Sequence, residues 1–389
     1  MSAAAAQATP LEVQTPRNDP VSPSSEVAGA EIDEKLLAGR SPAPLTLRRA
    51  IADARDFDQL QEVGRELHTT AVSLHGAQVG PAQASAIISD LADSLTRRSI
   101  ELSVSELGAP PCPLSWVVLG SHGRREPVPG SDVDSALAWD GDEDDEDAKS
   151  YMGLLGSRVC GALARCGLTA DKRGATAAQD LFVRPISDWR RLIRESISEP
   201  RQDKGLIVIS LFLDGRVLHH GGGASGLRHE FRAAPRRGLL RLMLSLSLAN
   251  KPSVGFLRDF ALERSGEHRG LIDIKHGGLL PVTSIARYAS LAAGAIDAVS
   301  TQERLSAADA GGTLDSDFAH SLSDSFELFQ SVRLEHQVHQ IQRGDEPDDH
   351  LDPKALEPAR RCQLRDAFRE VRSVQRKLGR RLSGELAFA

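Results

Sequence analysis

The sequence predicts an α+β fold in which a layer of helices is followed by a mixed-sheet domain and then by an all-α helical bundle. Three observations support this order. Apolar residues recur at helical spacing before residue 108, short apolar runs occur between residues 116 and 213, and strand patterns are absent after about residue 236. A chain of 389 residues is long enough for two or three domains of this kind.

The composition is that of an ordinary globular protein and excludes several classes of function. Hydrophobic residues make up 40% of the chain and charged residues 26%. The formal net charge is −7, whereas bulk, sequence-independent binding of nucleic acid needs a basic surface. No stretch approaches the roughly 18 apolar residues of a membrane span, and the N-terminus lacks the apolar core of a secretion signal. We therefore expect neither a membrane nor bulk nucleic acid as a partner.

The four cysteines indicate a reducing compartment. Cys112, Cys160, Cys166 and Cys362 form no C-x-x-C pair in the sequence and no metal-type cluster with histidine. Reduced thiols of this kind are typical of cytosolic proteins. The predicted location is therefore cytoplasmic.

The first 108 residues divide into a tail and a helical layer. Residues 1–45 contain six prolines and no aromatic residue, so they cannot bury enough apolar surface to offset the entropy of ordering, and we predict that they are disordered. Residues 46–108 are predicted to be helical because two sets of apolar residues recur at 3.6-residue spacing. The sets are Leu60, Val63, Leu67, Ala71 and Leu74, and then Ile88, Leu91, Leu95 and Leu102.

Residues 109–235 contain the strand patterns. The runs 116–119 and 207–213 are short, apolar and bounded by turn residues, as buried strands are. Residues 132–139 alternate roughly between polar and apolar side chains, which is typical of a half-buried strand. Between residues 139 and 207, apolar residues at helical spacing predict two helices.

Residues 236–389 are predicted to form an all-α bundle. Four segments place their apolar side chains on one helical face, and none alternates as a strand does. The segments are 239–246, 285–298, 322–332 and 364–378.

The stretch from Leu119 to Asp134 contains the residues with the clearest chemistry. Gly120 and Ser121 follow the first predicted strand, where a position without a side chain lets backbone N–H groups approach phosphate oxygens. The Ser121 hydroxyl adds a donor, and the guanidinium of Arg124 suits phosphate oxygens. These three residues are the predicted nucleotide-binding group.

Two carboxylates end the same stretch. Asp132 and Asp134 are two positions apart at the start of a predicted strand, so both side chains should project from one face. Paired hard oxygen ligands suit Mg²⁺, or Mn²⁺ in its place, with water and phosphate oxygens completing the coordination. Asp-x-Asp alone is common by chance. The ordered set of strand, Gly-Ser, basic loop and Asp-x-Asp is far more specific and predicts a metal site for a triphosphate.

This ordered set resembles the signature of nucleotidyltransferases in the DNA-polymerase-β-like superfamily. The matching residues are Gly120-Ser121, Gly123-Arg124, Glu126, Asp132 and Asp134. The superfamily includes bacterial uridylyltransferases that modify the nitrogen-regulatory signalling protein. A closer resemblance is to nucleotidyltransferases that are often fused to CBS or cyclic-nucleotide-binding domains. One departure is the Pro-Val-Pro at residues 127–129, where that group has Gln-Thr-Leu.

The resemblance implies roles for residues outside the motif. Asp214 would be the third catalytic carboxylate, binding the metal or taking the proton of the acceptor, although an Asp at a strand end is also common in turns. The group has a C-terminal substrate-binding domain, which the region around Lys275, Arg287 and Arg333 resembles. These three residues would then contact the acceptor; the alternative is that they are solvated or form internal ion pairs.

The resemblance also implies a reaction. A Mg²⁺-dependent enzyme of this kind transfers a nucleoside monophosphate from a nucleoside triphosphate (NTP) to an acceptor hydroxyl and releases pyrophosphate. By analogy with protein uridylyltransferases and adenylyltransferases, the acceptor would be a protein in a signalling role. Two alternatives stay open: a regulatory protein that binds nucleotide without transferring it, and a nucleotidyltransferase that modifies a small molecule.

Overall fold

The computed structural model describes residues 43–170, 174–201, 205–221, 223–232, 236–255 and 260–387. Residues 1–42 of the predicted disordered tail lie outside the described residues, and the first helix begins at Pro44. Among the helices of the described residues, none combines the length and the apolar character needed to span a bilayer.

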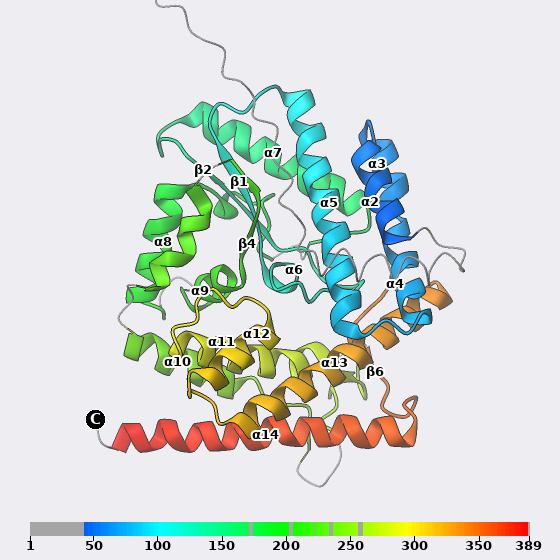
Figure 1. Ribbon diagram of the computed structural model, residues 1–389, viewed down its shortest axis with the longest axis vertical. Helices are drawn as coiled ribbons and strands as arrows, with labels where there is room; N and C mark the ends of the chain where they lie inside the picture. Colours follow the sequence, from blue (N-terminus) through cyan, green and yellow to red (C-terminus); the bar gives the residue numbers. More distant parts are fainter. Residues whose placement is uncertain are drawn as a thin grey trace, which may run out of the picture.

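Four helices precede the sheet and form the predicted N-terminal layer (Figure 1). They are α2 (Pro44–Asp53), α3 (Phe57–Gly64), α4 (Glu66–Gly76) and α5 (Pro81–Leu107). Both α2 and α5 begin with proline, which is favourable because the N–H that proline lacks has no intrahelical acceptor in the first turn. Asp56 caps α3 by accepting a 2.8 Å hydrogen bond from the Gln59 backbone N–H.

The predicted mixed sheet is confirmed and has four strands in the order β3-β2-β1-β4. The strands are β1 (Leu114–Val118), β2 (Ser135–Trp139), β3 (Val183–Pro185) and β4 (Arg216–His220). β1 pairs antiparallel with β2 and β4, and β3 pairs parallel with β2. In the central pair, Val118 lies opposite Ser135, so the chain leaves β1 and enters β2 at the same edge of the sheet.

Alternate residues of the two central strands face opposite helical layers, as the period of a strand requires. Trp116 and Leu137 belong to the core cluster shared with α5 and α7, whereas Val117 and Ala136 belong to the cluster shared with α8 and α9. Figure 1 shows these helices on either side of the sheet. Their bounds are α7 (Glu146–Arg165), α8 (Ile186–Ser198) and α9 (Gly205–Asp214).

The predicted strand at residues 207–213 is wrong, because this segment is helix α9. A short apolar run does not distinguish a buried strand from a buried helix. Ile209, Phe212 and Leu213 are buried at helical spacing, while Ile207 is 55% exposed on the opposite side. The strand next to β1 is instead β4, which begins two residues after α9 ends.

The C-terminal region is the predicted all-α bundle, with a two-stranded ladder inserted in it. Phe329, Phe368 and Val282 are fully buried in its core. The helices are α10 (Arg236–Ala249), α11 (Leu280–Ala292), α12 (Thr301–Ala310), α13 (Ser316–Arg343) and α14 (Pro358–Ala387). In Figure 1 these helices lie below the sheet, with α14 along the outer side.

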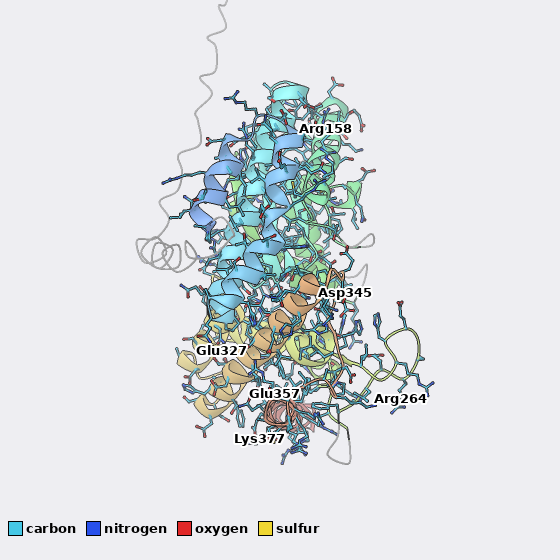
Figure 2. The ribbon with its side chains drawn as sticks, turned by 90° about the vertical axis from the view of Figure 1, so that its right-hand side faces the viewer. Arg158, Arg264, Glu327, Asp345, Glu357 and Lys377 are labelled. Atoms are coloured by element: carbon cyan, nitrogen blue, oxygen red, sulfur yellow. The ribbon has the colours of Figure 1, made fainter. Side chains whose placement is uncertain are left out.

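The ladder and a short π-helix bring the bundle next to the sheet domain. β5 (Ile272–Asp273) pairs antiparallel with β6 (His350–Leu351), and the π-helix η3 (Lys275–Leu279) connects β5 to α11. π-helical turns are rare in proteins, and those that occur are often at functional sites. Figure 2 shows the loop that precedes β5, with Arg264 near its tip, projecting from the bundle.

Candidate active site

Gly120 lies where β1 ends and the four-residue helix α6 (Gly120–Gly123) begins. Its φ of +59° is in the left-handed region that favours glycine. A Cβ at this position would lie 2.2 Å from Oδ2 of Asp134, so the carboxylate occupies the space that the absent side chain leaves. Glycine is therefore needed here for two reasons, its backbone conformation and the close approach of Asp134.

Asp132 and Asp134 lie in the segment that leads into β2. The predicted strand at residues 132–139 begins later than expected, at Ser135, although the Asp134 carbonyl still accepts a 2.9 Å hydrogen bond from the Leu119 N–H. Both aspartates are partly exposed, whereas the neighbouring Val133 and Ser135 are buried. This alternation gives the two carboxylates the common side that the strand pattern predicted.

Ser121 is the second predicted phosphate contact and lies next to these carboxylates in the fold. Its side chain is partly buried, and its hydroxyl has no hydrogen-bond partner among the residues that the structure describes. Arg124 is different. Its guanidinium donates to Glu126 Oε2 at 2.8 Å and to Asp214 Oδ2 at 2.5 Å. The predicted nucleotide-binding group is thus divided between a Gly120-Ser121 pair, of which Ser121 is partly exposed and Gly120 is buried, and an arginine held in an ion-pair network.

Lys275 reaches the predicted metal site from the helical region. Its Nζ lies 3.1 Å from Oδ2 of Asp132, and the two side chains are 39% and 41% exposed. Lys275 is the first residue of η3, 143 positions from Asp132 in the sequence. The contact brings one predicted acceptor-binding residue directly to one predicted metal ligand.

Asp214 has an entirely different environment. It is 2% exposed and accepts hydrogen bonds from three arginines. Arg287 donates to both carboxylate oxygens at 3.0 and 2.7 Å, and Arg304 donates to Oδ1 at 2.6 Å. Burial alone would raise the pKa of Asp214, but Arg287, Arg304 and Arg124 together hold the pKa well below its usual range.

These contacts fill the acceptor capacity of Asp214. Each of its two oxygens accepts two donors, which accounts for the roughly four lone-pair positions of a carboxylate. Such a group is typical of a buried ion cluster rather than of an open metal ligand. The role of Asp214 as a third catalytic carboxylate stays a prediction, and this geometry does not favour it.

The loop between Gly120 and Asp134 is fastened to the helical region at several points that the sequence did not indicate. The carboxylate of Glu126 accepts hydrogen bonds from the backbone N–H and the hydroxyl of Thr301. Gln330 donates to the Glu126 carbonyl at 3.1 Å. Gln337 accepts from the Gly130 N–H at 2.9 Å. Because these partners are more than 170 positions apart, no local pattern could have predicted them.

Arg287 and Arg333, the other two predicted acceptor contacts, are buried in ion pairs. Arg287 binds Asp214, as described above. Arg333 on α13 donates to both oxygens of Asp349, at 2.5 and 3.0 Å. These environments match the alternative of internal ion pairs, and a contact of either residue with an acceptor stays a prediction.

Two family models match the chain on either side of Asp214. One is described as "Putative nucleotidyltransferase DUF294" and matches residues 65–203, and the other is described as "Putative nucleotidyltransferase substrate binding domain" and matches residues 237–382. The chain belongs to this nucleotidyltransferase-like family. No curated protein matches it.

In this nucleotidyltransferase-like chain the two matched segments meet at the Asp132–Lys275 contact. Asp132 lies in the segment matched as nucleotidyltransferase, and Lys275 lies in the segment matched as substrate-binding domain. Asp214 lies in neither segment. The candidate site is therefore formed where the two family segments touch.

A pocket of about 680 Å³ adjoins the Gly123–Glu126 segment of the nucleotidyltransferase motif. Its other walls come from α5, from the start of β4, from the start of α12 and the loop before it, and from α13. The charged lining has both signs and consists of Arg124, Arg125, Arg216, Glu126, Asp297, Glu303 and Glu327. Such a lining suits a polar molecule better than a triphosphate, which would meet four carboxylates there.

His122 lies beneath the motif loop and is 2% exposed. Burial lowers the pKa of His122 to about 4, although Asp93 and the backbone of Ser131 act in the opposite direction. The ring is therefore neutral at pH 7 and acts as a buried support for the loop. This role could not be predicted from the sequence, because a histidine between a serine and a glycine has no preferred environment.

Proposed function

We propose that this chain is a Mg²⁺-dependent nucleotidyltransferase that transfers a nucleoside monophosphate from an NTP to a hydroxyl on a protein acceptor, in a signalling role. The family match supports nucleotidyl transfer as the general reaction. The contact that supports the location of the site is the Lys275–Asp132 pair, which joins the two family segments beside Gly120, Ser121 and Asp134.

The donor set fits a hard divalent cation. Asp132 and Asp134 supply carboxylate oxygens on a common, partly exposed side, which is the ligand type that Mg²⁺ prefers. When bound, the ion would neutralise charge on the triphosphate and on the departing pyrophosphate. We assign Asp132 and Asp134 as its protein ligands and give Asp214 a structural role, because its acceptor positions are filled by arginines.

The neighbouring residues would bind and orient the triphosphate. The Gly120 backbone and the Ser121 hydroxyl provide donors for phosphate oxygens. Lys275 pairs with Asp132, and its flexible ammonium would move to a phosphate oxygen when a cation binds Asp132. The acceptor hydroxyl would form a bond to the α-phosphorus while the bond to pyrophosphate breaks.

The helical region supports an acceptor larger than a metabolite. The match to a substrate-binding domain spans residues 237–382, and this region contributes Lys275 to the site. A protein acceptor follows by analogy with uridylyltransferases that modify signalling proteins.

The test is transfer of label from each NTP, in the presence of Mg²⁺, to proteins of a cell lysate. The full chain should label at least one protein. The double variant Asp132→Asn/Asp134→Asn should lose transfer by roughly 10³-fold or more, since metal-ion catalysis contributes several kcal/mol. The control Asp142→Asn/Asp144→Asn removes two exposed carboxylates at the same spacing and should behave as wild type. Unchanged labelling and unchanged Mg²⁺–NTP affinity in the first variant would overturn the assignment.

A nucleotide-binding regulatory protein is the second candidate, and one observation favours it. The two-metal form of nucleotidyl transfer uses further acidic ligands, and the third carboxylate expected from the resemblance, Asp214, is fully occupied. This candidate predicts tight Mg²⁺–NTP binding that needs Asp132 and Asp134, with no label transferred to any protein.

A further inference from the structure

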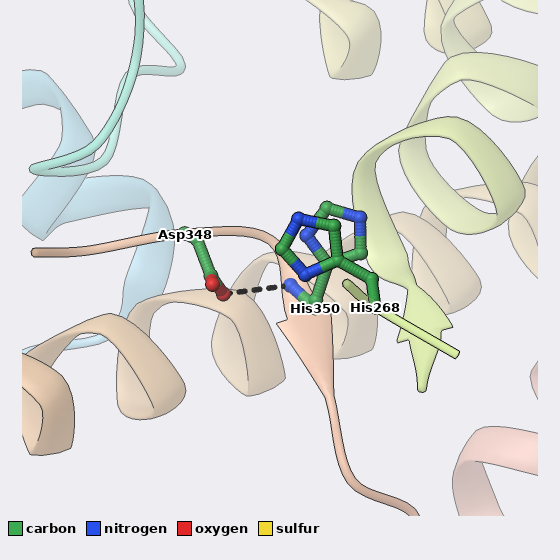
Figure 3. A group of neighbouring side chains, drawn as sticks. All are labelled: His268, Asp348 and His350. Atoms are coloured by element: carbon green, nitrogen blue, oxygen red, sulfur yellow. Dashed lines mark hydrogen bonds between the residues drawn. The ribbon is translucent and has the colours of Figure 1, made fainter. Parts of the chain in front are cut away.

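A second group of metal-ligand side chains lies in the helical region, apart from the Asp132–Asp134 site. It consists of His268, Asp348 and His350, and their ligand atoms all lie within 4.8 Å of one another. Figure 3 shows the two imidazole rings side by side, with the Asp348 carboxylate facing them. His268 and Asp348 are 80 positions apart in the sequence, so folding alone brings the group together.

The ladder and the projecting loop position the three residues. His350 is in β6, directly opposite Asp273 of β5, and Asp348 comes just before β6. His268 is on the loop that projects before β5. That loop folds back on itself through hydrogen bonds of 2.9 Å that join Glu263 to Leu271 and to Gly270.

His350 has a ring nitrogen that is available as a ligand. Its Nδ1 is buried and has no hydrogen-bond partner among the described residues. A buried polar atom without a partner lowers the stability of the folded state, so such atoms are uncommon. Its other nitrogen, Nε2, lies 3.9 Å from a carboxylate oxygen of Asp273. The buried Nδ1 is therefore the nitrogen of His350 that is available as a metal ligand.

Asp348 is held in place by hydrogen bonds to its carboxylate and to its backbone. Its Oδ1 accepts hydrogen bonds from the His350 backbone N–H at 2.9 Å and from Nε2 of His336 at 3.1 Å. The Asp348 backbone N–H donates to Gln340 at 2.9 Å. These contacts orient the Asp348 side chain. They use Oδ1, so Oδ2 is the oxygen that would bind a metal ion, because a carboxylate has about four acceptor positions.

We propose that His268, Asp348 and His350 bind a divalent transition-metal ion of the Zn²⁺ class. Two imidazoles and one carboxylate are a ligand set for such ions, whereas Mg²⁺ prefers oxygen ligands alone. The rings of His268 and His350 are stacked, with centroids 3.5 Å apart and planes within 5°. Binding turns their nitrogens towards one point, so the stacked rings separate when the ion is bound.

The ion would fasten the projecting loop to the β5–β6 ladder. Lys275, which contacts Asp132, follows the last residue of β5 by two positions, so the lysine lies next to the ladder that the ion would fix. The site would thus stabilise the edge of the helical region that faces the nucleotidyltransferase motif. It does not depend on the proposed reaction, because its ligands are separate from Asp132 and Asp134.

The experiment uses the full chain without a histidine tag, stripped of metal with a chelator. Zn²⁺ is titrated by calorimetry in the presence of excess Mg²⁺, and Co²⁺ is titrated in parallel to record its visible absorption. Wild type should bind one equivalent of Zn²⁺ through these ligands. His268→Ala lies on an exposed loop and should lower the affinity about 100-fold or more, and His336→Ala, which removes a partner of Asp348, about 10-fold.

Two controls separate this site from other ligands. His320→Ala removes an exposed histidine elsewhere on α13 and should leave Zn²⁺ binding unchanged. Asp132→Asn/Asp134→Asn should also leave it unchanged. Loss of Zn²⁺ binding in that double variant with retention in His268→Ala would overturn the proposal, because the ion would then bind the motif carboxylates. Equal, weak binding in wild type and His268→Ala would overturn it as well.

Discussion

Two carboxylates of the sheet domain contact basic residues of the helical region, and their environments differ in nearly every respect. Asp132 is 41% exposed and has one basic partner among the described residues, Lys275. Asp214 is 2% exposed and binds three arginines, two of them from the helical region. Both contacts join the same two regions of the molecule, so the difference lies in burial and in the number of bonds.

The difference separates a group that is available for binding from one that holds the fold together. A half-exposed pair contributes little to stability, because water screens both charges and the long lysine side chain loses entropy. A buried cluster cannot lose one member without leaving the others unpaired in a poorly polar surrounding. We therefore expect Asp132 to be the carboxylate that is available for ligand binding at this interface, and Asp214 to stabilise the packing of the two regions.

The largest effect on stability is expected for Asp214→Asn. Three arginines would lose their common carboxylate, and breaking a buried charge cluster costs about 3–5 kcal/mol. The measurement is the free energy of unfolding in urea. Asp297→Asn, which removes an exposed partner of Arg232, is the control and should cost under about 1 kcal/mol. A variant of near-normal stability that loses transfer would instead assign Asp214 to the chemistry.

A pH effect of about 3 kcal/mol on the free energy of unfolding is expected from His122, which supports the loop between Gly120 and Asp134. The unfolded chain binds a proton at this ring near pH 6.5 and the folded chain only near pH 4. Above pH 6.5 the ring is neutral in both states and has no effect on the free energy of unfolding. As pH falls from 6.5 to 4, only the unfolded state takes the proton, so stability falls over that window.

The test compares wild type with His122→Asn in urea unfolding at pH 7, 6 and 5. Other groups titrate in this range, so the measured quantity is the difference in slope between the two proteins. Wild type should lose stability more steeply as pH falls. Parallel curves would show that His122 is accessible to protons in the folded state.

Gly120→Ala should cost about 2 kcal/mol. The positive φ strains any side chain there, and the new methyl would displace the Asp134 carboxylate. Gly153 in α7 is the matched control, since a Cβ there meets nothing within 4 Å. Gly153→Ala should stabilise the protein by about 0.5–1 kcal/mol. If both substitutions stabilise, the close approach of Asp134 to Gly120 is not a feature of the protein in solution.

The smallest effect on stability is expected for Lys275→Met, under about 1 kcal/mol, because its pair with Asp132 is half-exposed. Affinity for Mg²⁺–NTP should nevertheless fall about 10-fold, the scale of a hydrogen bond to a charged group. Arg287→Met is the contrasting variant and should destabilise by about 3 kcal/mol, as it breaks the buried cluster. A Lys275 variant as unstable as the Arg287 variant would contradict the comparison.

The order of structural elements was largely predictable, because each depends on a pattern within one segment. Helical spacing predicted the N-terminal layer, α7 and the long helices α13 and α14. The Gly120-Ser121 and Asp132-x-Asp134 elements predicted which residues lie where β1 ends and β2 begins. The failure at residues 207–213 has the same origin, since a run of seven residues of which six are apolar suits a buried helix and a buried strand equally well.

The pairing of charged side chains was decided only by the tertiary structure. Nothing near Asp214 in the sequence indicates that arginines surround it, because its partners Arg287 and Arg304 lie 73 and 90 positions away. The same holds for the contact of Lys275 with Asp132 and for the convergence of His268 with His350. The apolar face of a helix or strand can be predicted from the spacing of its own apolar residues, so it depends on that element alone. Whether a carboxylate meets one exposed lysine or three buried arginines depends on which elements pack against it, and that is a property of the whole chain.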